Sequence, residues 1–531
     1  MLGLTTYRKR LYGWLSYAFA SEVFVIVSLT LFLPICLEQF ARDRGYVAED
    51  RSIRCNDWTG EPRACVVRIG WLWIDTASFS LYTYSASVAL QALTVISCGG
   101  IADHPPHRKI LLLIFAAFGS IGAIGFLLLP SESPVWFLVS VLAAAANVGF
   151  GASVVAMNSY LPFLAKESPE VVEIKEEIRD APGGDADALD ADENPNAPLI
   201  APSAERTALQ ERYETALSRA TSRISSLGIA IGYGAGICLL AITLIPVIQL
   251  KESTFSLRLA IGCSGIWWAV FTIPAAIWLP GASAFASDAS SAKDWSLLRE
   301  IAAAWKRLGG MLHPREVAKL RNTFTYLAAW FLLSDGFTTI TSTAVLFGKT
   351  TLHMQPGALI IIGVLTPLAG IGGSLLWPAL QRRFGWSNLR VLTLLVMLAS
   401  LVPAYGCIGF LPFFHGKDGL RFGGLTSPEE MFVLAIYFGS IYGAFQSFAR
   451  AFYAELLPPG EEARWYGLFS ITDKSSSFIG PLVVGLIADS TGNIRYAFFF
   501  LVGMIWAAVP VLSRVDVERG RRDAREYRYN M

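Results

Sequence analysis

Five ionisable side chains lie inside stretches of the sequence that are otherwise apolar. They are Glu22, Asp335, Arg450, Asp473 and Lys474. A charge in the apolar core of a membrane costs several kcal/mol, so such residues face a water-filled cavity or pair with one another. The five residues include both negatively and positively charged side chains. An arginine can hold a carboxylate through two hydrogen bonds while an acid holds an ammonium group. The five residues could therefore bind a zwitterion, or could serve only as static ion pairs that hold helices together.

Uncharged amide side chains accompany these charges. Asn147 and Asn158 fall in one apolar stretch, and Gln446 lies in the same stretch as Arg450. Amides in membrane helices more often bond a neighbouring helix than a ligand, and both uses remain open. We include these three residues with the five charged ones as candidate substrate- or ion-binding residues.

The two acids Glu22 and Asp335 project to similar depths. At 1.5 Å per helical residue, Glu22 lies about 18 Å beyond Arg10. Asp335 lies about 21 Å beyond Arg321 by the same measure. The apolar core of a bilayer is about 30 Å thick, so both acids are expected near its middle, where transporters built from repeated halves bind substrates and coupling ions.

The elements that would position these residues are membrane helices. The chain has 531 residues, of which 53% are hydrophobic and 16% are charged, whereas a soluble protein carries about 25% charged residues. About 20 apolar residues are enough to cross a bilayer as a helix. The apolar windows predict twelve spans, at 14–37, 76–101, 111–130, 135–164, 224–249, 258–280, 324–349, 356–380, 389–412, 431–457, 467–488 and 495–514. We therefore expect an all-α polytopic membrane protein.

Lysine and arginine set the expected orientation. They are more frequent in the segments that share a side with the two termini than in those on the other side. The loop 38–75 is rich in basic residues on that other side, but acids offset them. Because basic residues favour the cytosolic side, both termini are expected in the cytosol.

Weak internal matches indicate two repeated halves. Residues 17–24 and 330–337 both read aromatic-x-x-x-Ser-acid-x-Phe, which relates Glu22 to Asp335. Two further matches follow in the same order, one at the ends of spans four and ten and one at the starts of spans five and eleven. The expected division is 1–165 and 223–282 for the first six-helix half, 166–222 for an acidic cytosolic loop, 283–322 for a cytosolic linker, 323–514 for the second half and 515–531 for a basic cytosolic tail.

Three of the predicted loops have distinct features. The loop 166–222 is acidic and rich in Pro, Gly and Ala, which favours disorder, with a surface helix expected over 204–222. The linker 283–322 has the periodicity of an amphipathic helix at the membrane surface. Cys55 and Cys65 lie in the non-cytosolic loop 38–75. They would form a disulfide in an oxidising compartment or remain two thiols in a reducing one.

Other function classes find no support in the sequence. The five histidines have no metal-ligand spacing, so neither a metal nor a cofactor is expected. A nucleophile elbow of the Gly-x-Ser-x-Gly type is missing, which argues against a hydrolase. A basic stripe with interleaved aromatics, which would suggest a nucleic acid partner, is missing as well. The expected partners are the lipid bilayer and a small solute, with protons as a second ligand, and the oligomeric state stays open.

The loop 99–109, GGIADHPPHRK, resembles the G-x-x-x-D-x-x-x-x-R-[RK] loop of the major facilitator superfamily. It departs from that pattern at 105–107, where the superfamily often has a glycine. The corresponding loop of the second half, 381–385, lacks the acid. In the superfamily this element latches the cytosolic side, so the resemblance implies a gating role for Asp103 and Arg108.

More specifically, the chain resembles the fungal autophagy-related protein 22 family within that superfamily. The segments that establish the resemblance are YGWLSYAFASEVF (12–24), LPICLEQFARDRGY (33–46), NSYLP (158–162), SRISSLGIAIGYGAG (222–236), LLSDGFTTI (332–340), RWYGLFSITDKSSSFIGP (464–481) and GLIADSTGNIRYAFFF (485–500). They run from the first span to the last. Only the acidic loop and the tail lack the family's character.

The resemblance implies a transporter of the vacuolar membrane. It would export amino acids released by autophagic degradation, such as leucine, isoleucine and tyrosine, from the lumen to the cytosol by alternating access. Two alternatives stay open, a non-transporting membrane factor in vesicle or lipid breakdown and a facilitator-type carrier of another small solute.

Overall fold

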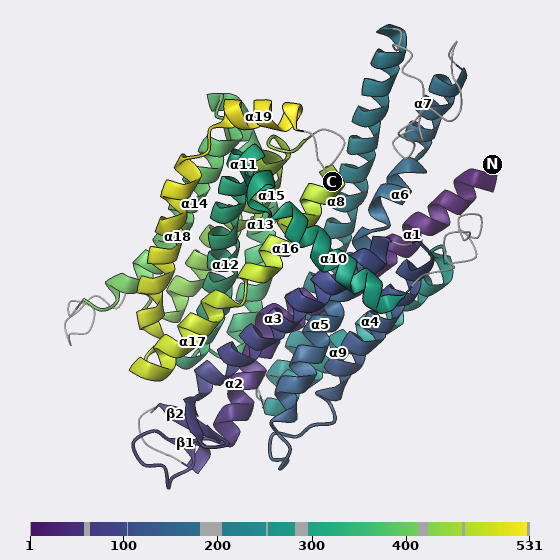
Figure 1. Cartoon of the computed structure of the whole chain (residues 1–531). Coiled ribbons are helices and arrows are strands. Elements are labelled where there is room, and N and C mark those ends of the chain that lie inside the picture. Colours follow the sequence, from purple (N-terminus) through teal and green to yellow (C-terminus); the bar gives the residue numbers. More distant parts are fainter. Residues whose placement is uncertain are drawn as a thin grey trace.

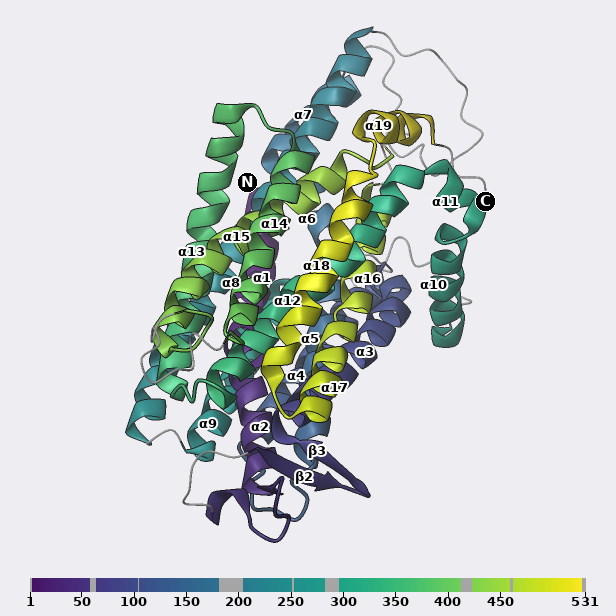
Figure 2. The same cartoon turned by 90° about the vertical axis from the view of Figure 1, so that its left-hand side faces the viewer.

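The protein is a bundle of long helices with a small sheet at one end (Figure 1). The computed structural model describes residues 2–57, 64–103, 105–180, 204–250, 253–281, 296–411, 423–458 and 462–527. Both ends of the chain lie at the end of the bundle opposite the sheet (Figures 1 and 2). We call these the termini end and the sheet end.

The first half begins with one continuous helical rod, made of α1 (Leu2–Val23), the π-helix η1 (Phe24–Phe32) and α2 (Leu33–Asp43). A π-helix inside an α-helical rod is rare and is often found at functional sites. The other helices of this half are α3 (Thr76–Asp103), α4 (Pro105–Gly125), α5 (Leu138–Asn158), α6 (Leu161–Lys166), α7 (Pro169–Asp180), α8 (Ala204–Gln249) and α9 (Thr254–Trp278).

The second half follows two linker helices, α10 (Leu297–Met311) and α11 (Pro314–Lys319). Its elements are α12 (Arg321–Thr350), α13 (Pro356–Phe384), α14 (Asn388–Ile408), α15 (Pro428–Ala454), α16 (Glu462–Ser476), α17 (Ile479–Thr491), the 3₁₀ turn η7 (Ile494–Tyr496), α18 (Ala497–Ser513) and α19 (Val517–Glu526). Like the first half, it is built from long apolar helices.

Eleven helices within the described residues are long and apolar enough to cross a membrane. The predicted span 467–488 is not among them, because the chain forms two shorter helices there, α16 and α17. Pro481 accounts for the break, since a proline lacks the amide hydrogen that a helix needs and its ring clashes with the preceding turn.

The two halves use the same helix pairings. In the first half α3 packs on α5, α1 on α9, and α4 on both α5 and α9. In the second half α13 packs on α15, α12 on α18, and α14 on both α15 and α18. Two buried arginines recur as well. Arg258 donates to the carbonyls of Phe126 and Leu127 after α4, and Arg495 donates to the carbonyl of Gly406 in α14. The repeat inferred from sequence is thus present in the packing.

Disorder was expected over the acidic loop 166–222. In the part of this loop that the structure describes, the chain is largely helical instead. Helix α7 packs along the N-terminal half of α8, where Glu170 pairs with Arg223 and Glu177 pairs with Arg212. The surface helix expected over 204–222 is continuous with the span that follows it, so that α8 runs through both. Residues 181–203 lie outside the described part of the chain. The linker holds α10, which packs against α3.

The small sheet was not expected in an all-α protein. Its strands are β1 (Tyr46–Val47), β2 (Cys65–Ile69) and β3 (Leu72–Asp75), all antiparallel, with Tyr46 opposite Val66 and Val66 opposite Asp75. The 3₁₀ turn η2 (Cys55–Asp57) precedes β2. Cys55 and Cys65 form a disulfide here, with their Cα atoms 6.1 Å apart. The strands are too short and too irregular in pattern to be recognised from sequence.

Candidate functional site

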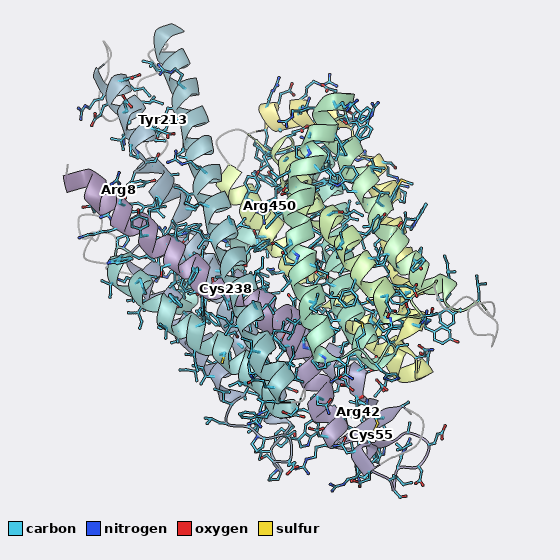
Figure 3. The ribbon with its side chains drawn as sticks, turned by 180° about the vertical axis from the view of Figure 1, so that it is seen from behind. Arg8, Arg42, Cys55, Tyr213, Cys238 and Arg450 are labelled. Atoms are coloured by element: carbon cyan, nitrogen blue, oxygen red, sulfur yellow. A yellow bond between two sulfur atoms is a disulfide. The ribbon has the colours of Figure 1, made fainter. Side chains whose placement is uncertain are left out.

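Glu22 lies close to charges from the other half of the molecule. It is the second-last residue of α1, directly before the π-helix. Its carboxyl group interacts electrostatically with Lys474 of α16 and Arg450 of α15. Figure 3 shows Arg450 on the side of the second half that faces α8. Three of the five predicted ionisable residues therefore lie within electrostatic reach of one another where the two halves face each other.

Three tyrosines that the sequence reasoning missed lie in the same place. Tyr233 of α8 interacts electrostatically with Glu22 and Arg450. Tyr84 of α3 interacts in the same way with Asp335 and Asp473, and Tyr442 of α15 with both Asp473 and Arg450. The spacing could have identified Tyr442, because Tyr442, Gln446 and Arg450 recur every four residues and share one helix face.

We call this group the central cluster. Its members come from five helices, α1, α3, α8, α15 and α16, and are Glu22, Tyr84, Tyr233, Tyr442, Gln446, Arg450, Asp473 and Lys474. Gln446 donates from Nε2 to the hydroxyl of Tyr442 at 3.2 Å. Asp473 is ion-paired with its neighbour Lys474 at 3.2 Å and accepts a hydrogen bond from Ser334. The cluster combines both signs of charge with aromatic surface, which suits an organic zwitterion.

Asp335 occupies a different environment from Glu22. Only 2% of its surface is exposed. Its two carboxylate oxygens accept from the backbone amide of Gly480 at 3.0 and 2.9 Å, and one of them accepts from the hydroxyl of Thr339 at 3.3 Å. Gly480 is in the first turn of α17, where amides have no partner within the helix. Asp335 therefore caps α17.

Glu22 also packs against a glycine, but on a continuous helix. A Cβ atom added to Gly232 of α8 would lie 2.5 Å from Cγ of Glu22. The amide of Gly232 is in the interior of a long helix, where amides bond to carbonyls of the same helix. Gly232 therefore offers Glu22 no free helix amide, and the electrostatic partners of the Glu22 carboxyl group are side chains.

The two asparagines do not join the central cluster. Asn147 is fully buried, donates to Ser87 at 2.9 Å and accepts from the side chain of Gln91 at 2.9 Å. These bonds join α3 to α5, which is a packing role. Asn158 is exposed and is the last residue of α5.

The predicted gating residues lie at the termini end. Arg108 donates from Nε to the carbonyl of Ala102 at 3.0 Å, and its guanidinium lies 5.1 Å from the ring centre of Tyr160. Arg108 thus joins α3, α4 and the segment after α5, all within the first half. The side chain of Asp103 lies outside the described part of the structure.

At the sheet end, polar contacts join the two halves. The hydroxyls of Ser85 and Ser78 in α3 donate to the carbonyls of Phe478 and Gly485, at 2.6 and 2.8 Å. The amide of Asp75 donates to Asp489 at 2.8 Å. We call these three bonds the α3–α17 seam. Beside it, Lys349 of α12 forms an ion pair with the buried Glu38 at 2.7 Å.

The carboxyl group of Asp75 has a pKa above the ordinary value of an aspartate. Burial, together with the nearby Glu38 and Asp489 carboxylates, raises the pKa of Asp75 to about 6, although the amides of Ala77 and Ser78 bond its carboxylate and oppose the shift.

Among the described residues, no group of three or more His, Cys, Asp and Glu side chains has the arrangement of a metal site.

Comparison with known proteins identifies the family. The model of the family described as "Vacuole effluxer Atg22 like" matches residues 6–525. Autophagy-related protein 22 of Cryptococcus neoformans is 42% identical over 97% of this chain and 96% of its own, and autophagy-related protein 22-1 of Neosartorya fischeri is 40% identical over 98% and 91%.

Solved structures show the same fold at low identity. The xylose transporter XylE from E. coli, in an inward open conformation, superposes with a TM-score of 0.54 and 9% identity, covering 96% of this chain and 95% of its own. The nucleoside transporter NupG also gives a TM-score of 0.54, at 12% identity over 96% and 99%. Both share the major facilitator fold predicted from the sequence. The chain therefore belongs to the Atg22-like family of vacuole effluxers, and it is a multi-pass membrane transporter rather than an enzyme.

Proposed function

We propose that the protein carries amino acids, such as leucine, isoleucine and tyrosine, from the vacuole lumen to the cytosol by alternating access. Membership of a vacuole effluxer family supports the route and the direction. The observation that most supports the substrate class is the position of Glu22, which faces Arg450 and Lys474 across the two halves.

The central cluster suggests how an amino acid is bound. Glu22 would receive the ammonium group, and the guanidinium of Arg450 would hold the carboxylate through two hydrogen bonds. The two contacts come from opposite halves, so a bound zwitterion would draw the halves together. Tyr84, Tyr233 and Tyr442 would surround the apolar side chain. Binding would replace the electrostatic attraction between Glu22 and Arg450.

The sides of the membrane follow from the charge distribution. We assign the termini end to the cytosol because lysine and arginine are concentrated there. The sheet end, with the Cys55–Cys65 disulfide, would then face the oxidising lumen. In that orientation the α3–α17 seam and the Lys349–Glu38 pair close the lumenal side, as expected for a state that releases substrate to the cytosol.

Protons are the second ligand that we propose. Glu22 lies close to two cations and could take up a proton in the acidic lumen and release it on the cytosolic side. A protonated Glu22 would no longer hold an ammonium group, so proton binding and substrate binding would compete. Asp103 and Arg108 remain proposed gating residues at the cytosolic side.

The test is transport by the purified protein in liposomes. Vesicles would be loaded with unlabelled leucine, and uptake of labelled leucine, tyrosine and xylose would be compared, with and without a pH gradient. We expect exchange of leucine and tyrosine and none of xylose. Uptake of the sugar alone would contradict the proposal and support a carrier of another small solute.

A further inference from the structure

The break between α16 and α17 creates a helix end in the middle of the bundle. Helix α17 begins at Ile479, directly after Phe478. The first amides of a helix have no partner within that helix, and leaving them unbonded away from water costs free energy. Pro481 removes one such amide by its chemistry. Gly480 retains its amide hydrogen and needs an acceptor.

Two adjacent residues of α12 hold the chain on either side of the break. Ser334 donates to the carboxylate of Asp473 in α16. Asp335, the next residue, accepts from the amide of Gly480 in α17 through both oxygens. A short segment of one helix thus sets the positions of two others.

The space around Gly480 is closed. A Cβ atom at this position would lie 2.0 Å from the hydroxyl oxygen of Thr339 and 2.7 Å from Oδ1 of Asp335. A side chain at residue 480 would therefore displace the cap. The close approach of α17 to Asp335 depends on glycine here.

The two short helices differ in the hydrogen bonds that connect them to the halves. In α16 the carbonyl of Trp465 accepts from the hydroxyl of Tyr453 in α15, at 2.9 Å, within the second half. In contrast, the three bonds of the α3–α17 seam connect α17 and the preceding Phe478 to the first half. The bond from Gly480 to Asp335 connects α17 to α12 of the second half. Helix α17 is therefore shared between the halves, and its link to α12 lies at one end.

We propose that Asp335 is a positioning residue that forms the pivot of α17, and that α17 swings about Gly480 as the gate of the sheet end. When this end opens, the bonds of Ser78 to Gly485 and of Asp75 to Asp489 separate, and the Asp335–Gly480 bond stays. Because Ser334 holds Asp473 one residue away, the swing of α17 moves the central cluster. This inference rests on the proposed function only where transport of leucine is measured.

Three variants separate a pivot from a ligand. In Asp335→Asn the amide oxygen can still accept from Gly480, whereas Asp335→Ala removes the acceptor. Gly480→Ala displaces the Asp335 cap without changing the chemistry of the Asp335 side chain. Gly467→Ala in α16 is the matched control, because a Cβ atom there meets nothing within 4 Å.

The first measurement is hydrogen–deuterium exchange of the full-length protein in nanodiscs, without substrate. We expect peptides that cover 479–491 to exchange about tenfold faster in Asp335→Ala and in Gly480→Ala. Asp335→Asn and Gly467→Ala should stay within about twofold of the wild type. Unchanged exchange in both Asp335→Ala and Gly480→Ala would overturn the pivot, whatever the protein transports.

The second measurement separates substrate binding from turnover. In liposomes, Asp335→Ala should lower leucine turnover by about tenfold, while leucine affinity, measured at equilibrium, changes less than about threefold. Asp335→Asn should restore most of the turnover. If Asp335→Asn instead weakened binding as strongly as Asp335→Ala, Asp335 would be a substrate ligand and the inference would be wrong. Failure of the wild type to transport leucine would contradict the proposed function alone.

Discussion

At the scale of single residues, Glu22 and Asp335 occupy the same place in the two repeats and have different partners. Each packs against a glycine of a neighbouring helix, Gly232 for Glu22 and Gly480 for Asp335. Beside Asp335 the neighbouring helix begins, so its free amide binds the carboxylate. Beside Glu22 the helix is continuous, and the carboxylate faces Arg450 and Lys474. The break in one repeat explains why the two acids have different partners.

Arg450 provides the first prediction. We expect Arg450→Gln to raise the KM for leucine by about tenfold or more, since a hydrogen bond between charged groups contributes about 1.5–3 kcal/mol. The measurement is the concentration dependence of leucine uptake in liposomes. Arg390→Gln is the control, because Arg390 is an exposed residue of the first turn of α14. An unchanged KM in Arg450→Gln would remove this residue from the binding site.

At the scale of elements, α8 and the rod of α1 and η1 pack unusually closely. Cβ atoms added at Gly228, Gly232 and Gly236 would lie within 3 Å of Trp14, Glu22 and Ile26. The three glycines recur every four residues and present one face to the rod. This face brings the backbone of α8 against the side chain of Glu22.

Gly232→Ala tests this packing directly. The added methyl group must displace Glu22, which costs about 1–3 kcal/mol as overpacking, so we expect leucine transport to fall by about tenfold in a protein that still folds. Gly234→Ala is the matched control, since a Cβ atom there meets nothing within 4 Å. Equal transport by the two variants would show that close packing of Glu22 is not needed.

The sequence predicted the long helices well, because a membrane helix depends on local composition. The sequence predicted one span over 467–488, whereas the structure has two helices there. The mean apolarity of a stretch of residues does not reveal that the helix is interrupted before Pro481. The sequence assigned Asp335 and Glu22 the same binding role, because they occupy corresponding positions in the two repeats. A sequence repeat does not show which groups each acid contacts in the fold. The three tyrosines were missed since tyrosine is common in membrane helices, and only the fold brings Tyr84 and Tyr233 from α3 and α8 to the charges.

At the scale of the whole molecule, the sheet end joins the two halves through a small acidic group. Asp75, Glu38 and Asp489 lie near one another, with Lys349 paired to Glu38 and Tyr82 close to both aspartates. Because this group spans the interface, its protonation is linked to closure. Separating the halves would remove Asp489 from Asp75 and expose both to water, which would lower the pKa of Asp75 again.

Asp75 therefore makes closure depend on pH. Its pKa of about 6 in the folded protein lies above the ordinary value of 3.8, so the folded, closed form binds the proton more tightly. Stability is gained as pH falls through 6 toward 3.8 and is lost as pH rises through 6. We expect the Tm of the purified protein to fall between pH 5 and pH 7, and to fall less in Asp75→Asn, which can still cap α3. Equal pH dependence in the two proteins would contradict this role.

The central claim, that Glu22 binds the moving ligand, is tested most directly by leucine transport in Glu22→Gln across a series of pH gradients in liposomes. We predict that transport falls by about tenfold or more and that the remainder no longer responds to the gradient, whereas Glu173→Gln on the exposed face of α7 behaves as the wild type. Unchanged leucine transport by Glu22→Gln at every pH would contradict the account.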